Sequence, residues 1–413
     1  MTWSWASGAF SNDDLTTTTG TSTTVSPNNT GTGVLRADDG SGHTDDTGTF
    51  TVNAGVLANF EVDAPASGTA GVAFSVTITA KDSEGNTTTD VSGATALSVD
   101  DGTIDPASIA EVQFTDDGVW TGDVTLTRAG SRTITATNGS KTGSDTIDID
   151  PGPLDSFEVD APASGRAGTV FSVTITAKDA DGNTTTQVSG ATALSVDDGT
   201  IDPTSIAEAQ FTDDGVWTGD VTLTKAGSRT ITATNSGKTG SDAINIAAGE
   251  LASFEVDAPT SGIAGVAFSV TITAKDSESN ITTDISGATA LSVDDGTIDP
   301  ASLVETEFTD DGIWTGNVTL GKAGARTITA TNDGKTGSDT IDIEPGPLAS
   351  FEVDAPASGQ AGVAFSVTIT AKDSEGNTTT DVSGATALSV DDGTIDPASL
   401  VETEFTDDGI WTG

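Results

Sequence analysis

Hydrophobic and polar residues alternate along several short stretches of the chain, which is the period-two pattern of strands with one buried face. In the stretch 74–81, Phe74, Val76, Ile78 and Ala80 alternate with serine, threonine and lysine. Similar runs predict further strands in the same hundred residues at 57–63, 94–99, 119–127, 132–137, 145–150 and, as a short one, near Gln113. No segment shows a helical period. The pattern therefore predicts an all-β fold in which six or seven antiparallel strands form a two-sheet sandwich.

The same pattern recurs every 97 residues, because the motif "FEVDAP" begins at Phe60, Phe157, Phe254 and Phe351. A period of this length fits an independent sandwich domain rather than a solenoid repeat, so each unit is expected to fold by itself. The sequence predicts an elongated tandem array with the following units: 1–54, the C-terminal part of a divergent upstream unit; 55–151, repeat 1; 152–248, repeat 2; 249–345, repeat 3; and 346–413, a truncated repeat 4.

The joints between the repeats are short and differ in composition. Two of them contain the sequence "PGP", whose prolines restrict the backbone, whereas the joint at 245–254 has no proline. We expect this middle joint to bend more easily. The two ends of the chain cut through the repeat pattern, since Gly413 corresponds to Gly122 inside a predicted strand. We hypothesise that the sequence is an internal fragment of a longer array, which would account for the absence of a signal peptide and an anchor.

The repeats also show signs of copying. Residues 60–108 and 351–399 differ only at Thr69, which is replaced by Gln360, and the sixteen residues 301–316 are identical to 398–413. Such a mosaic is expected if the array lengthens by recombination, and a protein that tolerates it is expected to use its repeats as spacers.

Composition narrows the function classes. The chain has 63 acidic and 15 basic residues, a formal net charge of −48, one histidine and no cysteine. Such an acidic surface repels phosphate backbones and anionic lipids. We therefore expect neither nucleic-acid binding nor membrane insertion. It suits a soluble, monomeric, elongated protein in a saline habitat. Without cysteine, stability must come from core packing or bound ions.

Two stretches resemble the bacterial immunoglobulin-like repeats of invasin- and intimin-type surface adhesins. They are "AGVAFSVTITAKDSEGN" (70–86) and "DDGVWTGDVTLTRAGSRTITAT" (116–137), and the resemblance extends over residues 55–413. It implies a tandem of immunoglobulin-like sandwich domains that form an extracellular stalk, while the anchor and the receptor-binding domain lie outside this sequence. Repeat 3 departs from the pattern, because Ser279 replaces the glycine of the turn. This replacement indicates either that the turn does not need a positive φ or that repeat 3 turns differently.

The loop "AKDSEGNTTTD" (80–90) recurs in every repeat and invites a comparison with calcium-binding loops. An EF-hand loop needs a glycine at its sixth position and a glutamate at its twelfth. Counted from Asp82, the glycine falls at the fourth position and Gly93 at the twelfth, so the loop fails this test. Aspartate, asparagine and glycine together are typical of a tight turn, which is the interpretation we favour.

Other acidic and aromatic residues have two possible interpretations. The pairs Asp100–Asp101 and Asp116–Asp117 would share a calcium ion if their loops lay at the same pole of the sandwich; otherwise they are Asp-Gly turns, the simpler interpretation. Trp120 could offer a sugar-stacking platform, but its side chain lies on the same face of the predicted strand as Val124 and is expected in the core.

The following asparagines begin N-x-T sequons, which a glycosylating host would modify: Asn86, Asn183, Asn280 and Asn377.

Two functions remain open. One histidine and no cysteine cannot form a Cys-His pair or a typical zinc site, and nearly every acid belongs to a repeated turn, so we expect no enzymatic activity and no cofactor other than possible calcium. The first hypothesis is a structural stalk of a large secreted or cell-surface adhesin, with an unknown surface or glycan ligand bound by regions outside the fragment. The alternative is a spacer region of a large extracellular polysaccharide-acting enzyme.

Overall fold

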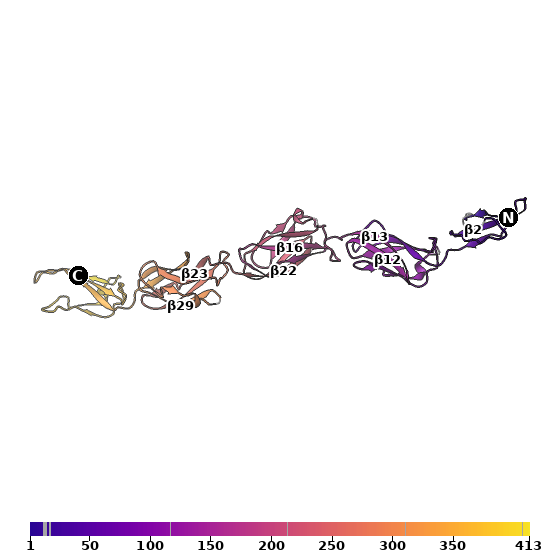
Figure 1. The fold of residues 1–413 in the computed structure, drawn as a ribbon. Helices are drawn as coiled ribbons and strands as arrows, with labels where there is room; N and C mark the ends of the chain where they lie inside the picture. The colour runs from indigo at the N-terminus through magenta and orange to yellow at the C-terminus, as the bar shows by residue number, and fades with distance from the viewer. Residues whose placement is uncertain (11–14, 16–17, 116, 213, 310, 407) are drawn as a thin grey trace.

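The chain forms a row of separate β-domains that follow one another from the N-terminus to the C-terminus (Figure 1). This is a computed structural model, and it describes all residues except 11–14, 16–17, 116, 213, 310 and 407. The N- and C-termini lie at opposite ends of the row, as expected for an elongated tandem array.

Each of repeats 1 to 3 is an immunoglobulin-like sandwich of two sheets. In repeat 1 the four-stranded sheet has the order β5-β7-β11-β9 and the five-stranded sheet the order β10-β8-β12-β13-β6. The strands of repeat 1 are β5 (Asn59–Asp63), β6 (Ser67–Thr69), β7 (Phe74–Lys81), β8 (Thr95–Val99), β9 (Ile104–Asp105), β10 (Ser108–Ile109), β11 (Val119–Leu126), β12 (Gly130–Asn138) and β13 (Lys141–Asp150).

Repeats 2 and 3 keep the same sheet orders with their own strands. Those of repeat 2 are β14 (Ser156–Asp160), β15 (Ser164–Arg166), β16 (Phe171–Lys178), β17 (Thr192–Val196), β18 (Ile201–Asp202), β19 (Ser205–Ile206), β20 (Val216–Leu223), β21 (Gly227–Asn235) and β22 (Lys238–Ala247). Those of repeat 3 are β23 (Ser253–Asp257), β24 (Ser261–Ile263), β25 (Phe268–Lys275), β26 (Thr289–Val293), β27 (Ile298–Asp299), β28 (Ser302–Leu303), β29 (Ile313–Leu320), β30 (Gly324–Asn332) and β31 (Lys335–Glu344).

The alternating side chains of the long strands build one core in each repeat. Val76, Ile78 and Ala80 of β7 are fully buried, and the equivalent positions are buried in repeats 2 and 3. Trp120 lies opposite Ile78 on β11 and is only 6% exposed, so it is a core residue and not a surface platform for sugars. Each repeat therefore has the separate hydrophobic core that an independent domain needs.

Sequence patterning found the long strands, but it gave one short segment the wrong structure and placed the start of the last strand too late. The expected strand near Gln113 is a 3₁₀-helix, η2 (Glu111–Gln113), and this helix recurs as η3 (Glu208–Gln210), η4 (Glu305–Glu307) and η5 (Glu402–Glu404). The last strand begins at Lys141 rather than at residue 145, because it forms a hairpin with β12 in which Asn138 pairs with Lys141. The turn at 139–140 thus joins two strands without a break in pairing.

The two terminal segments form smaller units. Residues 1–54 contain β1 (Thr2–Gly8), β2 (Gly31–Asp38), β3 (Thr44–Asp46) and β4 (Phe50–Val52), which form a single sheet. The rings of Trp5, Phe10 and Phe50 pack on one another in this segment. Residues 346–413 contain β32 (Ser350–Asp354), β33 (Thr368–Lys372), β34 (Thr386–Ala387), β35 (Ser399–Leu400) and β36 (Ile410–Thr412), divided between two small sheets.

The glycine two residues after each core tryptophan makes room for the indole ring, which leads to a prediction. A Cβ atom on Gly219 would lie 2.2 Å from Cζ2 of Trp217. We expect Gly219→Ala to displace this ring and to lower the free energy of unfolding of repeat 2 by about 1–3 kcal/mol. A urea titration of the full chain, followed by circular dichroism, should then show one repeat unfolding before the others. Ser172→Ala, on the exposed face of β16, is the control and should leave the transition unchanged; equal transitions for both variants would contradict the prediction.

Candidate functional site at the joints between repeats

The recurring acidic loop lies at the end of each repeat that faces the preceding repeat. In repeat 2 the loop starts at Asp179, directly after β16, and this side chain is 4% exposed. Its Oδ1 atom accepts hydrogen bonds from the backbone N–H groups of Asp181 (3.0 Å) and Asn183 (2.8 Å). Its Oδ2 atom accepts from the linker N–H of Gly152 (2.8 Å) and from Nδ2 of Asn183 (2.9 Å). One carboxylate therefore holds the loop, the linker and an asparagine side chain together.

Asn183 connects the loop to the preceding repeat. Its Nδ2 atom donates to the carbonyl of Thr127 (2.8 Å), and its Oδ1 atom accepts from the N–H of Ala129 (3.0 Å). Both partners belong to the turn between β11 and β12 of repeat 1. We call the set of Asp179, Asn183, Gly152 and the turn 127–129 the joint clamp, and use the same name for its equivalents at the other joints.

The linker glycine is fixed on its other side as well. The carbonyl of Gly152 accepts a hydrogen bond from Oγ1 of Thr185 (2.7 Å), a side chain with no solvent exposure. Both backbone polar groups of this glycine are therefore bound to repeat 2. The joint is a short segment pinned to one repeat, not a free linker.

The complete clamp recurs at the next two joints, and its donor half is present at the first joint. Asn280 donates to Thr224 (2.8 Å) and accepts from Ala226 (3.0 Å), and Asn377 donates to Gly321 (2.9 Å) and accepts from Ala323 (3.0 Å). At the first joint, Asn86 donates to the carbonyl of Asn28 (2.8 Å) in the N-terminal segment. The carboxylates bind the linker glycines in the same way, in the pairs Asp82–Gly55, Asp276–Gly249 and Asp373–Gly346, at 2.7–2.9 Å.

Neighbouring repeats also approach closely beside the clamp. Gly265, at a turn with φ of +78°, faces the carboxylate of Glu375 in the following unit, and a Cβ atom there would lie 2.6 Å from it. Gly71 faces Asp181 in the same manner, with 2.9 Å to a Cβ atom. The positive φ at both turns favours glycine, and a side chain there would displace the end of the facing acidic side chain.

The turn inside the loop is the same in all repeats, including the one that lacks glycine. Ser279 has a φ of +65°, close to the values of +83° at Gly182 and +86° at Gly376. The expectation that the serine frees the turn from a positive φ, or changes the turn, is therefore wrong. The hydrogen bonds of Asp276 to the loop hold Ser279 in a left-handed conformation that costs a residue with a Cβ atom about 1–2 kcal/mol.

The environment of Asp179 lowers its pKa. Burial alone would raise the pKa of this carboxyl, but the hydrogen bonds from Asn183 and from the N–H groups of Gly152 and Asp181 outweigh it and hold the pKa below the ordinary value of 3.8. The same balance lowers the pKa values of the equivalent carboxyls, Asp82, Asp276 and Asp373. The carboxylate is thus the charged form at neutral pH, as an acceptor of four hydrogen bonds must be.

The joint between repeats 2 and 3 carries an additional contact. Arg166 donates from Nη2 to Asp284 of repeat 3 (2.5 Å) and from Nε to the linker carbonyl of Ala248 (3.0 Å). The equivalent position holds Thr69 in repeat 1 and Ile263 in repeat 3, so among the joints between repeats 1 to 4 this ion pair is specific to the one without prolines. The ion pair opposes the bending that the missing prolines favour.

Of the acids considered for calcium, Asp100 and Asp101 lie at one end of the sandwich and Asp117 lies at the other. Asp100 accepts a hydrogen bond from the N–H of Thr133 (2.8 Å), and Asp101 is paired with Arg132 (3.3 Å) near the C-terminal end of β11. Asp117 precedes the N-terminal end of this eight-residue strand, about 26 Å away along its axis. Asp117 therefore cannot share one ion with Asp100 and Asp101. Asp116 lies outside the described residues, and these contain no group of three or more possible metal ligands.

The asparagines of the loop sequons are the asparagines of the clamp. Asn183 and Asn280 are 6% and 5% exposed, and their Nδ2 atoms each donate two hydrogen bonds. A glycan would attach to this same nitrogen, so modification would have to displace the contact between repeats. Glycosylation of Asn86, Asn183, Asn280 and Asn377 stays a prediction.

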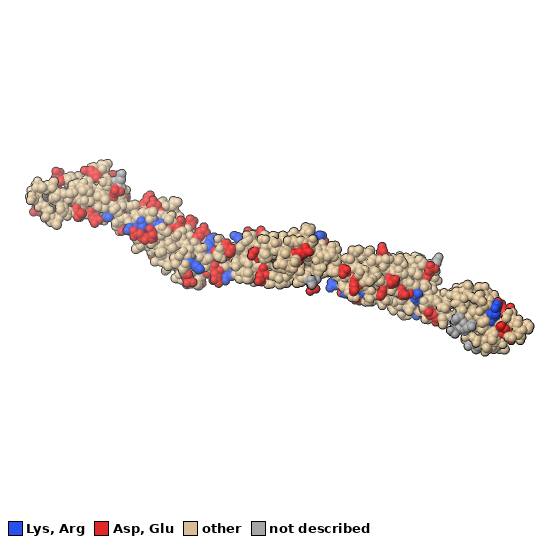
Figure 2. Space-filling view, turned by 90° about the horizontal axis from the view of Figure 1, so that it is seen from above, with Lys and Arg blue, Asp and Glu red and all other residues tan. Residues whose placement is uncertain are grey.

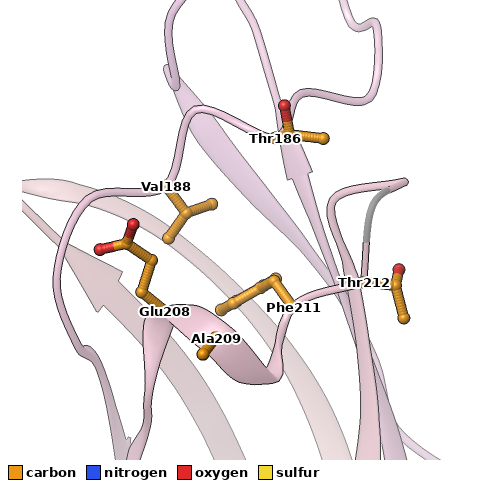
Figure 3. Close-up of a pocket in the computed structure, with 6 residues that line it drawn as sticks. All are labelled: Thr186, Val188, Glu208, Ala209, Phe211 and Thr212. Carbon is orange, nitrogen blue, oxygen red and sulfur yellow. The ribbon is translucent and has the colours of Figure 1, made fainter.

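The surface hollow shown in Figure 3 is a different kind of place. It has a volume of about 560 Å³ and is lined by Thr186, Val188, Glu208, Ala209, Phe211 and Thr212. Its single carboxylate, that of Glu208, already accepts a hydrogen bond from the N–H of Gly190 (2.7 Å). Among the described residues, the lining offers no second acid or base to pair with it. Within the part of the chain that the structure describes, no helix is long and apolar enough to cross a membrane.

Sequence reasoning treated the loop as a turn within one repeat and missed its contact with the neighbouring one. A signal for the contact is nevertheless present. Among the four copies of the loop the residue at the left-handed position changes from glycine to serine, but the asparagine that follows is the same in all copies. A turn alone would tolerate other residues at the asparagine position. A side chain that must both donate a hydrogen bond to the preceding repeat and accept one from it needs an amide group.

Comparisons with known proteins give resemblances in fold. No protein family description matches the sequence, and no curated protein matches it. Bacterial immunoglobulin-like adhesins are among the solved structures that resemble the chain. FdeC, an Escherichia coli adhesin, is 20% identical, with 71% of this chain and 99% of that chain covered and a TM-score of 0.35. Invasin, described as a bacterial integrin-binding protein, is 17% identical, with 77% of each chain covered and a TM-score of 0.31.

A third resemblance is to domains 4–9 of the surface layer protein SbsC, which is 16% identical, with 90% of this chain and 62% of that chain covered and a TM-score of 0.21. The assignment of the immunoglobulin-like sandwich rests on the strand pairing of this chain itself.

Removal of the clamp asparagine should loosen one joint without unfolding a domain. Asn183→Ala deletes two hydrogen bonds between repeats, each worth about 0.5–1.5 kcal/mol. Because the chain has no cysteine, spin labels attach only to the cysteines introduced by Ser98→Cys and Ser195→Cys. Double electron–electron resonance between the two labels then measures the distance between repeats 1 and 2. We expect a broader distance distribution in Asn183→Ala. Asn317→Ala, on the exposed surface of β29, is the matched control; an unchanged width in Asn183→Ala would show that the clamp does not set the joint.

The lowered pKa of Asp179 predicts how the clamp responds to acid. A carboxyl whose pKa is lower in the folded state stabilises that state above its unfolded pKa, about 3.9, and loses this contribution as the pH falls through the folded value. In Asp179→Asn, one of the two carboxylate oxygens becomes an NH2 group. Depending on the orientation of the amide, this donor faces the N–H of Gly152 or the N–H groups of the loop, and a hydrogen bond is lost in either case. We expect it to lower the melting temperature at pH 7, and the difference from the natural chain to shrink below about pH 4. Asp220→Asn, on the exposed face of β20, should cause little change at either pH, and a constant difference for Asp179→Asn would contradict this assignment.

Proposed function

We propose that this chain is a non-enzymatic spacer, a stalk region of a large secreted or cell-surface adhesin that holds neighbouring regions at a set distance. The observation that carries the proposal is the recurrence of the same asparagine contact with the preceding unit at every joint. Each repeat has the loop with its asparagine at one pole and the acceptor turn at the other, so consecutive repeats join in the same way. Reach then grows in proportion to the number of repeats.

The surface supports this role. Acidic side chains are spread along the whole length of the face seen in Figure 2, with basic side chains in smaller number among them. A net charge of −48 makes the repeats repel one another, which favours an extended array and opposes association with other copies. The adhesin's ligand, a surface or glycan group, would be bound by regions outside these residues.

Deletion of one whole repeat tests the spacer function. Removal of residues 152–248 joins repeat 1 to repeat 3 and brings Asn280 opposite the carbonyl of Thr127. We expect both flanking repeats to keep their melting temperatures and the maximum dimension in small-angle X-ray scattering to fall by at least about 30 Å, the length of one ten-residue strand.

The matched control is the same deletion combined with Asn280→Ala. This variant lacks the rebuilt clamp and should show a broader distribution of dimensions. A shortened chain whose dimensions do not decrease, or whose repeats bend freely with Asn280 in place, would overturn the spacer proposal.

A further inference from the structure

The turn that receives each clamp asparagine is held by a second loop of its own repeat. In repeat 1 this is the loop 100–103, which lies beside the turn 127–129, here called the acceptor turn. The N–H and the hydroxyl oxygen of Thr103 each lie 3.0 Å from Oγ1 of Thr127, and the N–H of Thr127 donates to the carbonyl of Thr103 (3.3 Å). The loop therefore fixes the residue whose carbonyl accepts the hydrogen bond from Asn183.

The loop and the acceptor turn are in close contact, because a glycine of the loop leaves no room for a side chain between them. A Cβ atom on Gly102 would lie 2.5 Å from the Cβ atom of Arg128, the middle residue of the turn. The equivalent distances are 2.5 Å for Gly199 and 2.7 Å for Gly296. A movement of the loop would therefore also move the turn that accepts the asparagine.

One arginine ties the same loop to the strand that begins at the end of the acceptor turn. The side chain of Arg132, in β12, is 16% exposed, and its Nη1 atom lies 3.3 Å from Oδ2 of Asp101 and 3.8 Å from Oδ2 of Asp100. Asp100 also accepts a hydrogen bond from the N–H of Thr133 (2.8 Å). We call Asp100, Asp101 and Arg132, together with their equivalents in repeats 2 and 3, the pole cluster.

The pole cluster has the same geometry in the other complete repeats. In each of them the Nη1 atom of the arginine lies 3.2–3.6 Å from both carboxylates, in the sets Arg229 with Asp197 and Asp198, and Arg326 with Asp294 and Asp295. The Nε atom of each arginine is buried without a hydrogen-bond partner among the described residues. A buried donor without a partner is unfavourable. The arginine thus lowers the stability of its own repeat at one end of its guanidinium group, while the other end contacts the two carboxylates.

Repeat 3 shows how the contact is kept when part of it is lost. Gly321 stands in the acceptor turn where repeats 1 and 2 have threonine, so the hydroxyl contact of the turn is not possible there. In this repeat Nζ of Lys322 lies 2.9 Å from Oδ2 of Asp295, a shorter distance than the 3.4 Å between Arg128 and Asp101 in repeat 1. The pole cluster therefore also holds the turn directly, through the basic residue in its middle.

The contacts of the pole cluster all lie within one repeat, whereas the asparagine comes from the next. Asn183 uses one donor and one acceptor, so the carbonyl of Thr127 and the N–H of Ala129 must both point toward it. A mobile turn would lose conformational freedom when it met the asparagine, and this loss would weaken the joint. A turn that is already fixed by its own repeat avoids the loss.

We propose that the pole cluster positions the acceptor turn for the asparagine of the next repeat, with Arg132, Arg229 and Arg326 as the positioning residues. This inference rests on the spacer function and identifies the residues that prepare the second half of each joint. The two can fail separately. Deletion of a repeat tests the spacer function, whereas the positioning role is tested by substitutions that leave every repeat and every clamp asparagine in place.

Arg132→Met in the full chain tests the proposal, because methionine keeps an unbranched apolar side chain and removes the charge and the donors. The spin labels at Ser98→Cys and Ser195→Cys measure the distance between repeats 1 and 2. The matched control is Arg229→Met, the same change at the opposite pole of repeat 2, where it affects the following joint. Urea titration establishes how much stability each variant loses.

We expect Arg132→Met to broaden the distance distribution between repeats 1 and 2, with an about fivefold larger population of bent joints, the effect of one lost hydrogen bond. Arg229→Met should lose similar stability to urea without broadening this distribution. When Arg132→Met is combined with Asn183→Ala, the distribution should be no broader than in Asn183→Ala alone, because the arginine acts through the asparagine contact.

A narrow distribution in Arg132→Met beside a broad one in Asn183→Ala would overturn the positioning role and leave the clamp and the spacer function intact. Equal broadening in the two arginine variants, or additive broadening in the combined variant, would overturn it as well. Should Arg132→Met fail to fold, Asp101→Asn weakens the same contact at a carboxylate whose side chain is 60% exposed, with Asp198→Asn as its control. These variants are read by the same criteria.

Discussion

The buried carboxylate at the start of each acidic loop is the group on which the array depends. In repeat 2, the carboxylate of Asp179 accepts four hydrogen bonds and thereby fixes the loop, the linker glycine and the side chain of Asn183 in one arrangement. Loss of this acceptor would leave several buried N–H groups unpaired, each at a cost of about 1–3 kcal/mol. The carboxylate does not contact the preceding repeat itself. It orients the asparagine that does, and so converts a turn within one domain into a connection between two.

The sequence predicted the repeated domains well and the joints hardly at all, for a physical reason. A period of 97 residues and the alternation in strands such as β7 are local signals, and they were sufficient for the sandwich and its core. The contact of Asn183 with Thr127 joins residues 56 positions apart in different domains. Only the three-dimensional arrangement of the two poles shows that these residues meet. The prediction of short segments failed for the same reason. β6 has three residues and pairs with the distant strand β13, and the segment near Gln113 is a helical turn.

The last strand of each complete repeat and the joint clamp of the next form a continuous path along the chain. β13 ends at Asp150, and Gly152, two residues later, is bound to Asp179 of the next repeat. No flexible segment lies between the last hydrogen bond of one repeat and the first of the next. A displacement at one end of a repeat is therefore transmitted to its neighbour by bonded backbone. This continuity explains why a linker of few residues, with or without prolines, can be stiff: its polar groups are bound and its length leaves no slack.

The chemistry of the clamp also suits a strongly acidic chain. The contacts that cross each joint are made by the neutral amide of an asparagine with backbone groups, so added salt, which screens charges, does not weaken them. Repulsion between acidic repeats disfavours bent arrangements and so keeps the array extended. The ion pair of Arg166 with Asp284 is the charged contact added to the middle joint, and both side chains are partly exposed. Added salt therefore screens the repulsion between repeats at every joint. At the middle joint, where no proline restricts the backbone, it also weakens the ion pair of Arg166 with Asp284.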